Sequence, residues 1–216
     1  INTDNGLTIE LIKTDITCFG INDGSISSTV SSGSGSYNYL WSTSSTNSNI
    51  NNLGPGVYSL TVTDVNTNCI SSDFIELLSP DSISISTAFV LEPSCFGQNN
   101  GQASVSVSGG NNIYAVTWTG IGVGFEQLNL SAGNYPITVT DQNNCTANGV
   151  VTINQPDSIQ VIVDQIINSY CVDQSDGEIY ISVIGGISPY NYSWANSGGT
   201  YSTTSDQDIN HLLPGT

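Results

Sequence analysis

One motif recurs three times along the chain at a nearly constant spacing, and this repeat limits the fold more than any other feature. The motif begins with a cysteine, and the three copies start 77 and 76 residues apart, at Cys18, Cys95 and Cys171. Self-similarity at a fixed period is the signature of tandem structural units. The third copy stops before its last expected strands, so we predict two complete repeats and an incomplete one, over residues 1–79, 80–155 and 156–216.

Within each repeat, apolar residues alternate with polar ones, which is the pattern of a β-strand with one buried face. In the second repeat the alternation predicts strands over 83–91, 102–108, 135–141 and 145–153, and a further strand ending at Trp118. Gly-Gly pairs and Asn-rich clusters between them are typical of turns. The run Leu-x-x-Gly-x-Tyr before the penultimate strand resembles the tyrosine corner of immunoglobulin domains. We therefore predict an all-β chain of immunoglobulin-like antiparallel β-sandwiches, each with six or seven strands.

The charge balance excludes several classes of partner. The formal net charge is −17, and Lys13 is the only basic residue. Phosphate contacts need Lys and Arg, so we exclude nucleic acid as a partner. An anionic membrane surface is disfavoured for the same reason. No apolar run approaches the roughly 18 residues of a membrane span, so we expect no membrane insertion of this segment.

No catalytic constellation is recognisable in the sequence. His211 is the single histidine, and it occupies the turn position that Asn52 holds in the first repeat. A histidine present in one copy cannot serve a site shared by all repeats. We expect no enzymatic activity and no cofactor.

Four aspartates are weak candidates for calcium binding: Asp23, Asp64, Asp81 and Asp141. Asp64 and Asp141 each open a segment that offers oxygen ligands on alternate residues. Neither segment has the glycine and glutamate of a helix–loop–helix calcium site. The alternative is that these aspartates stabilise hairpin turns through backbone hydrogen bonds. If calcium binds, we expect it at a junction of two repeats, where Asp23, Asp81 and Asp141 could converge.

The tryptophans follow the same spacing as the cysteines, at Trp41, Trp118 and Trp194. Equal placement in all three copies favours a core position on the third strand, facing inwards with the tyrosines nearby. The alternative is that the rings stack on sugars, as in a carbohydrate-binding module.

Three longer strings identify a resemblance to a known family. The first is Cys-x-Gly-x-x-Asp-Gly-Ser-Ile at 18–26, and the second is Gly-Gly-x-x-Pro-Tyr-x-Tyr-x-Trp at 185–194. The third is Leu-x-x-Gly-x-Tyr-x-Leu-x-Val-x-Asp at 53–64, with Cys69 close behind. Together they resemble the SprB repeat of very large cell-surface adhesins from gliding Bacteroidetes.

The resemblance implies an extracellular stalk or filament at the bacterial cell surface. It also implies export by type IX secretion and a role in surface attachment and gliding motility. The partners expected are neighbouring repeats of the same chain, with surface glycans or a substratum as further candidates. Two other functions remain open: a carbohydrate-binding module that contacts surface glycans, and a non-catalytic appendage of a secreted hydrolase.

The sequence Asp-Ser-Ile occurs at two equivalent positions, 81–83 and 157–159, just after a proline. It resembles the sequon at which Bacteroidetes attach O-linked glycans to exported proteins, so Ser82 and Ser158 are candidates for O-glycosylation. The alternative is ordinary linker chemistry, because Asp-Ser after proline favours a turn.

The five cysteines allow two pairing schemes, since disulfides are expected in an extracellular protein. Pairing within a repeat joins Cys18 to Cys69 and Cys95 to Cys145, and leaves Cys171 unpaired. In an immunoglobulin-like strand order, however, the two cysteines of one repeat lie at opposite ends of the sandwich. A strand of seven residues spans about 20 Å, whereas a disulfide allows about 7 Å between Cα atoms. Topology therefore favours a bond from Cys18 to Cys145, with the other three cysteines reaching towards repeats beyond this chain.

Overall fold

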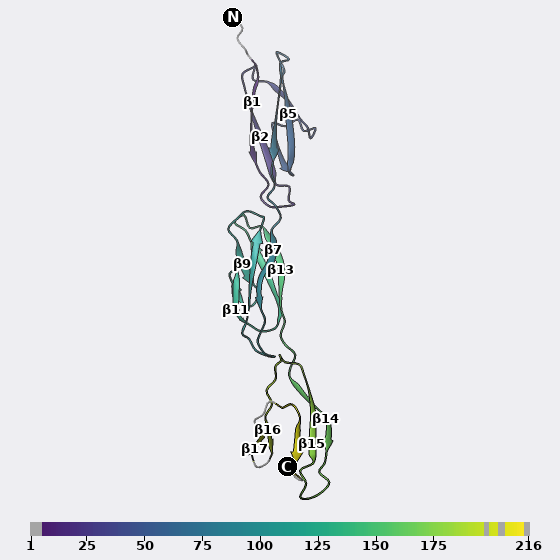
Figure 1. The fold of residues 1–216 in the computed structure, drawn as a ribbon. Helices are drawn as coiled ribbons and strands as arrows, with labels where there is room; N and C mark the ends of the chain where they lie inside the picture. Colours follow the sequence, from purple (N-terminus) through teal and green to yellow (C-terminus); the bar gives the residue numbers. More distant parts are fainter. Residues whose placement is uncertain (1–5, 197–198, 203–205, 214–216) are drawn as a thin grey trace. The chain divides into compact units, whose positions relative to one another are not determined.

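The computed structural model describes residues 6–196, 199–202 and 206–213. These residues form strands, turns and loops and include no α-helix (Figure 1). It follows that no helix suited to crossing a membrane occurs in the described ranges. The chain divides into two compact units: Ile1–Thr87, Val105–Phe125 and Pro136–Val150 form one, and Ala88–Ser104, Glu126–Tyr135 and Val151–Thr216 form the other.

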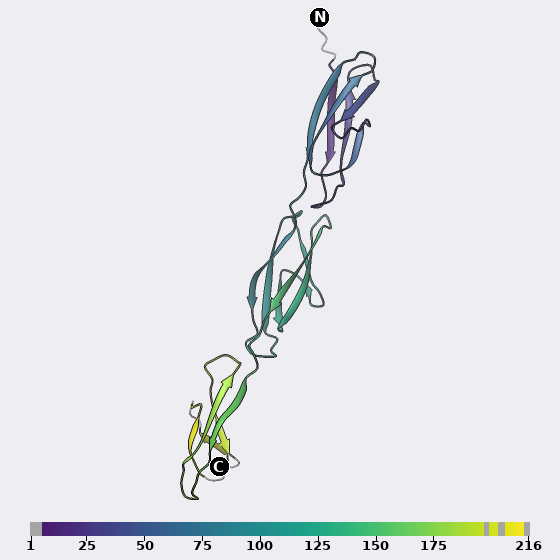
Figure 2. The same cartoon turned by 90° about the vertical axis from the view of Figure 1, so that its right-hand side faces the viewer.

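The first repeat contains six strands arranged in two antiparallel sheets (Figure 2). The strands are β1 (Thr8–Thr14), β2 (Gly24–Ser31), β3 (Tyr37–Trp41), β4 (Asn49–Leu53), β5 (Gly56–Asp64) and β6 (Ile70–Leu77). One sheet has the order β1-β2-β4 and the other the order β3-β5-β6. This is the A-B-E and C-F-G division of an immunoglobulin-like sandwich.

The alternation of apolar and polar residues builds the core of this repeat. In β5, Leu60 and Val62 are fully buried, while Thr61 between them is partly exposed. The buried cluster takes residues from both sheets and from the flanking loops: Leu7, Ile16, Ile26, Trp41, Ile50, Leu53, Leu60, Val62 and Leu77. Burial of this apolar surface is the main source of stability for a domain of this size.

The second repeat has the same order with one extra strand. Its strands are β7 (Ser84–Leu91), β8 (Gly101–Ser108), β9 (Ala115–Trp118), β10 (Gly122–Val123), β11 (Glu126–Leu130), β12 (Gly133–Thr140) and β13 (Thr146–Ile153). The sheets are β7-β8-β11 and β10-β9-β12-β13, so the short β10 extends the second sheet beside β9. The prediction of tandem immunoglobulin-like β-sandwiches is confirmed.

The third repeat contains β14 (Gln160–Ile167), β15 (Gly177–Ile184), β16 (Trp194–Asn196), β17 (Gly199–Ser202) and β18 (Ile209–Leu212). The β14-β15-β18 sheet corresponds to β1-β2-β4, and β16 pairs with β17. The sequence stops at Thr216, before a counterpart of β5. The expected repeat boundaries, after residues 79 and 155, fall between β6 and β7 and between β13 and β14, and they stay a prediction.

The tyrosine corner forms in both complete repeats. The Tyr58 hydroxyl donates to the carbonyl of Gly54 at 3.0 Å, and the Tyr135 hydroxyl donates to the carbonyl of Ser131 at 2.8 Å. In each case the acceptor lies four residues upstream, at the turn that enters the strand. The corner fixes how β5 and β12 enter their sheets.

Candidate functional site

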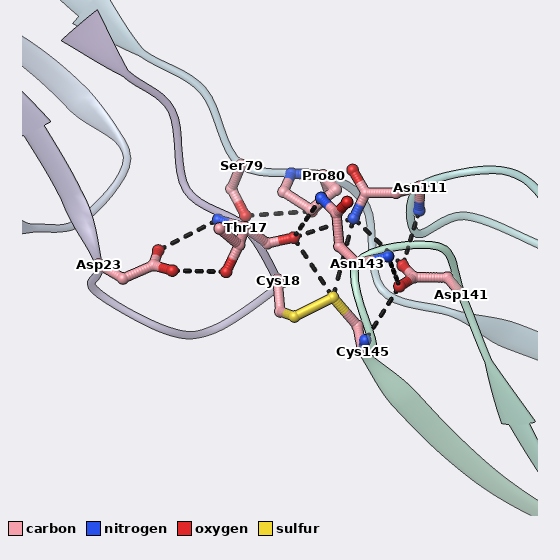
Figure 3. Close-up of a disulfide and its surroundings, with 9 residues drawn as sticks. All are labelled: Thr17, Cys18, Asp23, Ser79, Pro80, Asn111, Asp141, Asn143 and Cys145. Atoms are coloured by element: carbon pink, nitrogen blue, oxygen red, sulfur yellow. Dashed lines mark hydrogen bonds between the residues drawn. A yellow bond between two sulfur atoms is a disulfide. The ribbon is translucent and has the colours of Figure 1, made fainter.

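The most distinctive chemical feature of the chain is a disulfide between two repeats (Figure 3). It joins Cys18, in the β1–β2 loop (residues 15–23), to Cys145, in the β12–β13 loop (residues 141–145). The two Cα atoms are 5.6 Å apart, and the residues are 127 positions apart in sequence. This Cα separation lies within the range that disulfides adopt. We call Thr17, Cys18, Asn111, Asp141, Asn143 and Cys145 the bridge site.

Strand directions explain why Cys18 does not pair within its own repeat. The backbone N–H of Ile16 donates to the carbonyl of Leu78 at 3.1 Å, so the β1–β2 loop begins beside the end of β6. Cys69 immediately precedes the start of β6. The eight residues of β6 therefore separate the two cysteines, which corresponds to about 25 Å at about 3.3 Å per residue. The alternative pairing of Cys18 with Cys69, and of Cys95 with Cys145, is not the one present.

Asp141 organises the loop that carries Cys145. It is 4% exposed, and its carboxylate accepts backbone N–H groups from Asn111 at 2.8 Å and from Asn143 and Cys145 at 2.9 Å each. Burial raises the pKa of Asp141, but the hydrogen bonds from Asn111, Cys145 and Asn143 outweigh it and hold the pKa below its usual range. The charged carboxylate therefore fixes the backbone of the bonded cysteine and of the loop residue two positions before it.

The carbonyl oxygen of Thr17, in the β1–β2 loop, contacts the β8–β9 and β12–β13 loops of the second repeat directly. It accepts a hydrogen bond from Asn111 Nδ2 at 2.9 Å and one from Asn143 Nδ2 at 3.5 Å (Figure 3). The Sγ of Cys145 contacts the same oxygen at 3.3 Å. Asn111 Nδ2 also donates to Asp141 at 3.1 Å, so this amide connects the carboxylate to the opposite loop.

Asp23 holds Thr17 in place from within its own loop. Its carboxylate accepts the backbone N–H of Thr17 at 3.1 Å and also accepts the Thr17 hydroxyl. These two bonds lower the pKa of Asp23, the hydroxyl bond having the larger effect. In the second repeat Asn100 takes the same position and accepts the backbone N–H of Ser94 at 3.1 Å.

Asp64 repeats the arrangement of Asp141 in the first repeat. Its buried carboxylate accepts the backbone N–H of Ser34 at 2.6 Å, and those of Asn66 and Thr67 at 2.9 and 3.0 Å. The hydrogen bond from Ser34 is the main cause that holds the pKa of Asp64 well below its usual range. Asp64 and Asp141 are thus equivalent turn-forming carboxylates.

Three of the four calcium candidates, Asp23, Asp64 and Asp141, use their carboxylates in these hydrogen bonds. Within the described ranges, no group of three His, Cys, Asp or Glu residues is placed to hold a metal ion. Asp23, Asp81 and Asp141 therefore do not form the cluster considered from the sequence. The carboxylates of Asp23 and Asp141 are directed at N–H and O–H donors, and the Asp81 carbonyl accepts the N–H of Gly110 at 2.8 Å.

Of the other sequence-predicted residues, Ser82 lines a hollow together with Cys18 and Cys145. Cys69, Cys95 and Cys171 are exposed free thiols. Ser82 is exposed and Ser158 is half-buried. The carbonyls of both serines face glycines of a Gly-Gly turn, where a Cβ on Gly109 or Gly185 would lie about 2 Å from them.

The tryptophans divide into two groups. Trp41 and Trp118 are 2% and 1% exposed, and each indole N–H donates to a backbone carbonyl at 2.8 Å. Trp194 is only half-buried, so the sequence-based prediction that it is buried in the core like the other two is not met. In the strand register, Trp41 is opposite the buried Leu60 on β5 and Trp118 is opposite the buried Ile137 on β12, whereas Trp194 is opposite Ser202 on β17.

Thr17, Asn111 and Asn143 are the members of the bridge site that the sequence did not reveal. Asn111 follows the Gly109-Gly110 pair directly, and both glycines have positive φ. The Gly-Gly pattern predicts a turn but gives no role to the residue that follows it. The polar residue directly after the pair is the only signal that the sequence offers for Asn111.

Comparison with known proteins gives one family. The family described as "SprB repeat" matches three segments, residues 11–46, 87–123 and 164–199, which together make up just over half of the chain. No curated protein matches the chain.

Three solved structures are similar at low sequence identity. The three N-terminal domains of the bacteriophage RB49 highly immunogenic outer capsid protein (Hoc) are 15% identical with a TM-score of 0.44, covering 86% of this chain and 70% of that one. The C-terminal fragment of intimin, solved with the intimin-binding domain of its translocated receptor, is 16% identical with a TM-score of 0.36, covering 74% and 67%. The N-terminal eight immunoglobulin domains of Down syndrome cell adhesion molecule are 10% identical with a TM-score of 0.39, covering 99% and 40%.

Proposed function

Because the chain belongs to the SprB-repeat family, we propose that it is a structural stalk segment of a large bacterial surface adhesin. In this function the repeats act as a spacer that holds an adhesive part away from the cell, in surface attachment and in gliding. The observation that carries the proposal is the covalent bridge from Cys18 to Cys145, which fastens one SprB repeat to the next. Such a bond limits the movement of one repeat relative to the next, which suits a spacer, whereas an isolated binding module has no neighbouring repeat to be fastened to.

The proposed location is the extracellular face of the bacterium, reached by type IX secretion. A disulfide persists in an oxidising compartment and is rare in the cytoplasm. The net charge of −17 supports solubility at an exposed surface and opposes binding to anionic polymers. The bridge and the charge therefore agree with the location that the family implies.

The proposed partners are further repeats of the same type, held through the remaining cysteines. Cys95 lines a hollow together with Phe96, Ser158, Ile159 and Gly186. The equivalent residues around Cys18 line a second hollow, whose lining is completed by residues 144–147, at the end of the β12–β13 loop and the start of β13. The hollow at Cys95 is therefore suited to the corresponding loop of another SprB repeat, with that loop's cysteine bonded to Cys95.

We propose no catalytic role for this segment. The buried carboxylates of Asp64 and Asp141 serve as acceptors for backbone N–H groups of their own turns and of one neighbouring loop each. The single histidine, His211, lies in β18 with its Nδ1 2.7 Å from Asn210 Oδ1. These side chains are used for structure and not arranged around a common substrate position.

Labelling of intact cells tests the stalk proposal. Antibodies raised against this chain are expected to label unpermeabilised bacteria, and protease treatment of intact cells is expected to remove the signal. Deleting the segment in frame is expected to reduce attachment to surfaces and gliding speed. Labelling that requires permeabilisation contradicts the proposal.

A carbohydrate-binding module is the competing function, and it needs accessible aromatic rings. Trp41 and Trp118 are buried in the core, so they are unavailable for stacking on sugars. A glycan array probed with the purified chain separates the two functions, because a spacer is expected to bind no glycan. The third candidate, an appendage of a secreted hydrolase, requires a catalytic domain in the full-length gene product, which sequencing of that gene detects.

A further inference from the structure

The bridge changes which covalent bonds carry force when the stalk is pulled. A chain under tension transmits force along its shortest continuous covalent path. From the N-terminal side, that path follows β1 to Cys18, crosses the disulfide to Cys145, and continues along β13 towards the third repeat. We propose that the Cys18–Cys145 bond carries tensile load past the first two repeats, so that residues 19–144 bear none. The inference rests on the proposed stalk function.

The two strands on this path have almost no slack. β1 and β13 contain seven and eight residues, respectively. A β-strand already rises about 3.3 Å per residue, against a maximum of about 3.3–3.6 Å for a fully extended chain. Tension along β1 and β13 therefore cannot lengthen them appreciably.

Most of the core of both repeats lies inside the closed loop. The loop contains every strand from β2 to β12, and therefore also the core tryptophans Trp41 and Trp118. The disulfide holds the two ends of this loop together, so pulling on the ends of the chain does not pull the two ends of the loop apart. The cores are therefore held by the disulfide rather than by the strength of their strand pairings.

Without the bridge, the load has to cross non-covalent contacts. In the first repeat, β1 is tied to the end of β6 by the Ile16 N–H to Leu78 carbonyl bond, at 3.1 Å. Leu78 N–H donates to Asp15 Oδ1, and Lys13 Nζ donates to the Glu76 carbonyl, each at 2.8 Å. Each of these hydrogen bonds is weak compared with a covalent disulfide. β1 is also paired with β2 over its seven residues, and once all of these contacts break the repeat can unravel.

Force spectroscopy on the full chain tests the inference. The chain is pulled between handles at its two ends, with Cys69→Ser, Cys95→Ser and Cys171→Ser introduced so that Cys18 and Cys145 are the only thiols. The bridged chain is expected to lengthen only by residues outside the loop. Adding dithiothreitol at constant force then reduces the bond: the reagent forms its own disulfide, and the two cysteine sulfurs gain two electrons and two protons.

The expected gain on reduction is large. The bonded residues are 127 positions apart, which corresponds to about 420–460 Å of released chain at about 3.3–3.6 Å per residue. The matched control carries Cys18→Ser and Cys145→Ser in addition, and it is expected to reach this full length without reductant. If that control does not fold, the reductant-dependent step in the bridged chain decides by itself.

Three results overturn the inference: a bridged chain that extends as far as the control before reduction, no step on adding reductant, or a purified oxidised chain that lacks the bond. None of them bears on whether intact cells display the segment, because display is measured independently by antibody labelling. A chain that is displayed but extends fully without reductant rejects the load path and leaves the stalk proposal standing. A chain that shows the step but stays inside the cell rejects the stalk proposal instead.

Discussion

The carboxylate of Asp64 accepts the backbone N–H of Ser34 at 2.6 Å, and this contact ties the β5–β6 turn to the β2–β3 loop. Gly33 precedes Ser34 with a φ of +90°, and a Cβ there would lie 2.6 Å from Asp64 Oδ2. Close approach of the loop to the carboxylate therefore requires glycine at this position. The equivalent contact in the second repeat joins Asp141 to Asn111.

The first prediction concerns acid stability. The folded-state pKa of Asp64 lies below its usual value of about 3.9. Its contribution to stability is therefore complete above about pH 5 and is lost as the pH falls through the folded-state pKa. Asp64→Asn is expected to lower the melting temperature at pH 7 and to flatten its decline between pH 5 and 3, as measured by circular dichroism. Glu10→Gln, which removes an exposed carboxylate on β1, is the control, and an equal flattening in that variant contradicts the prediction.

The second prediction concerns the tryptophans. Trp41→Ala and Trp118→Ala are each expected to cost about 3–5 kcal/mol, as large aromatic truncations in cores do. Trp194→Ala is expected to cost clearly less, because its ring is half-buried. Urea unfolding followed by circular dichroism gives the three values. A cost for Trp194→Ala equal to that for Trp118→Ala shows that the third repeat buries its ring as fully as the others.

The third prediction concerns a glycine beside the bridge site. Gly110 has a φ of +60°, and a Cβ there would lie 2.9 Å from Asp141 Oδ2 and 2.7 Å from Ile83. Gly120 has a φ of +76° with no atom within 4 Å of its virtual Cβ. Gly120→Ala is expected to cost about 1–2 kcal/mol from backbone conformation alone. Gly110→Ala is expected to cost more because it also displaces the carboxylate, and equal melting temperatures for the two variants would falsify the steric argument.

The fourth prediction concerns the thiol count and the stability that the bridge provides. The oxidised chain is expected to expose three titratable thiols, from Cys69, Cys95 and Cys171, and the reduced denatured chain five. A non-reduced digest is expected to contain one linked peptide with Cys18 and Cys145. Breaking this bond is expected to cost about 2–5 kcal/mol, since the closed loop is long. Finding Cys18 linked to Cys69 instead contradicts the strand order described here.

The fold could be predicted because the information lies in local patterns. Alternation of apolar residues gives the strands to within two residues, as for β8 (Gly101–Ser108) and β13 (Thr146–Ile153). The Leu-x-x-Gly-x-Tyr string gives the tyrosine corner, whose acceptor is four residues away. Short sequence separation makes such features visible in one chain.

The bridge site could be predicted only in part. Strand order and the length limit of a disulfide favour Cys18 with Cys145, because both arguments depend on distances along the sandwich. The contact of Asn111 with Thr17 joins residues 94 positions apart, and no periodicity marks either of them. The exposure of Trp194 depends on which strands cover it, and a repeated position in the sequence does not reveal that.

The cysteine arrangement also affects how the number of repeats can change. Each complete repeat carries one cysteine in the loop after its first strand and one in the turn before its last strand. Gain or loss of one whole repeat adds or removes one cysteine of each kind, so the two kinds stay balanced. Bonds between successive repeats therefore remain possible after duplication or deletion of a unit, whereas loss of part of a repeat leaves an unmatched thiol. Arrays built in this way can vary in length by recombination between repeats without losing their covalent connections.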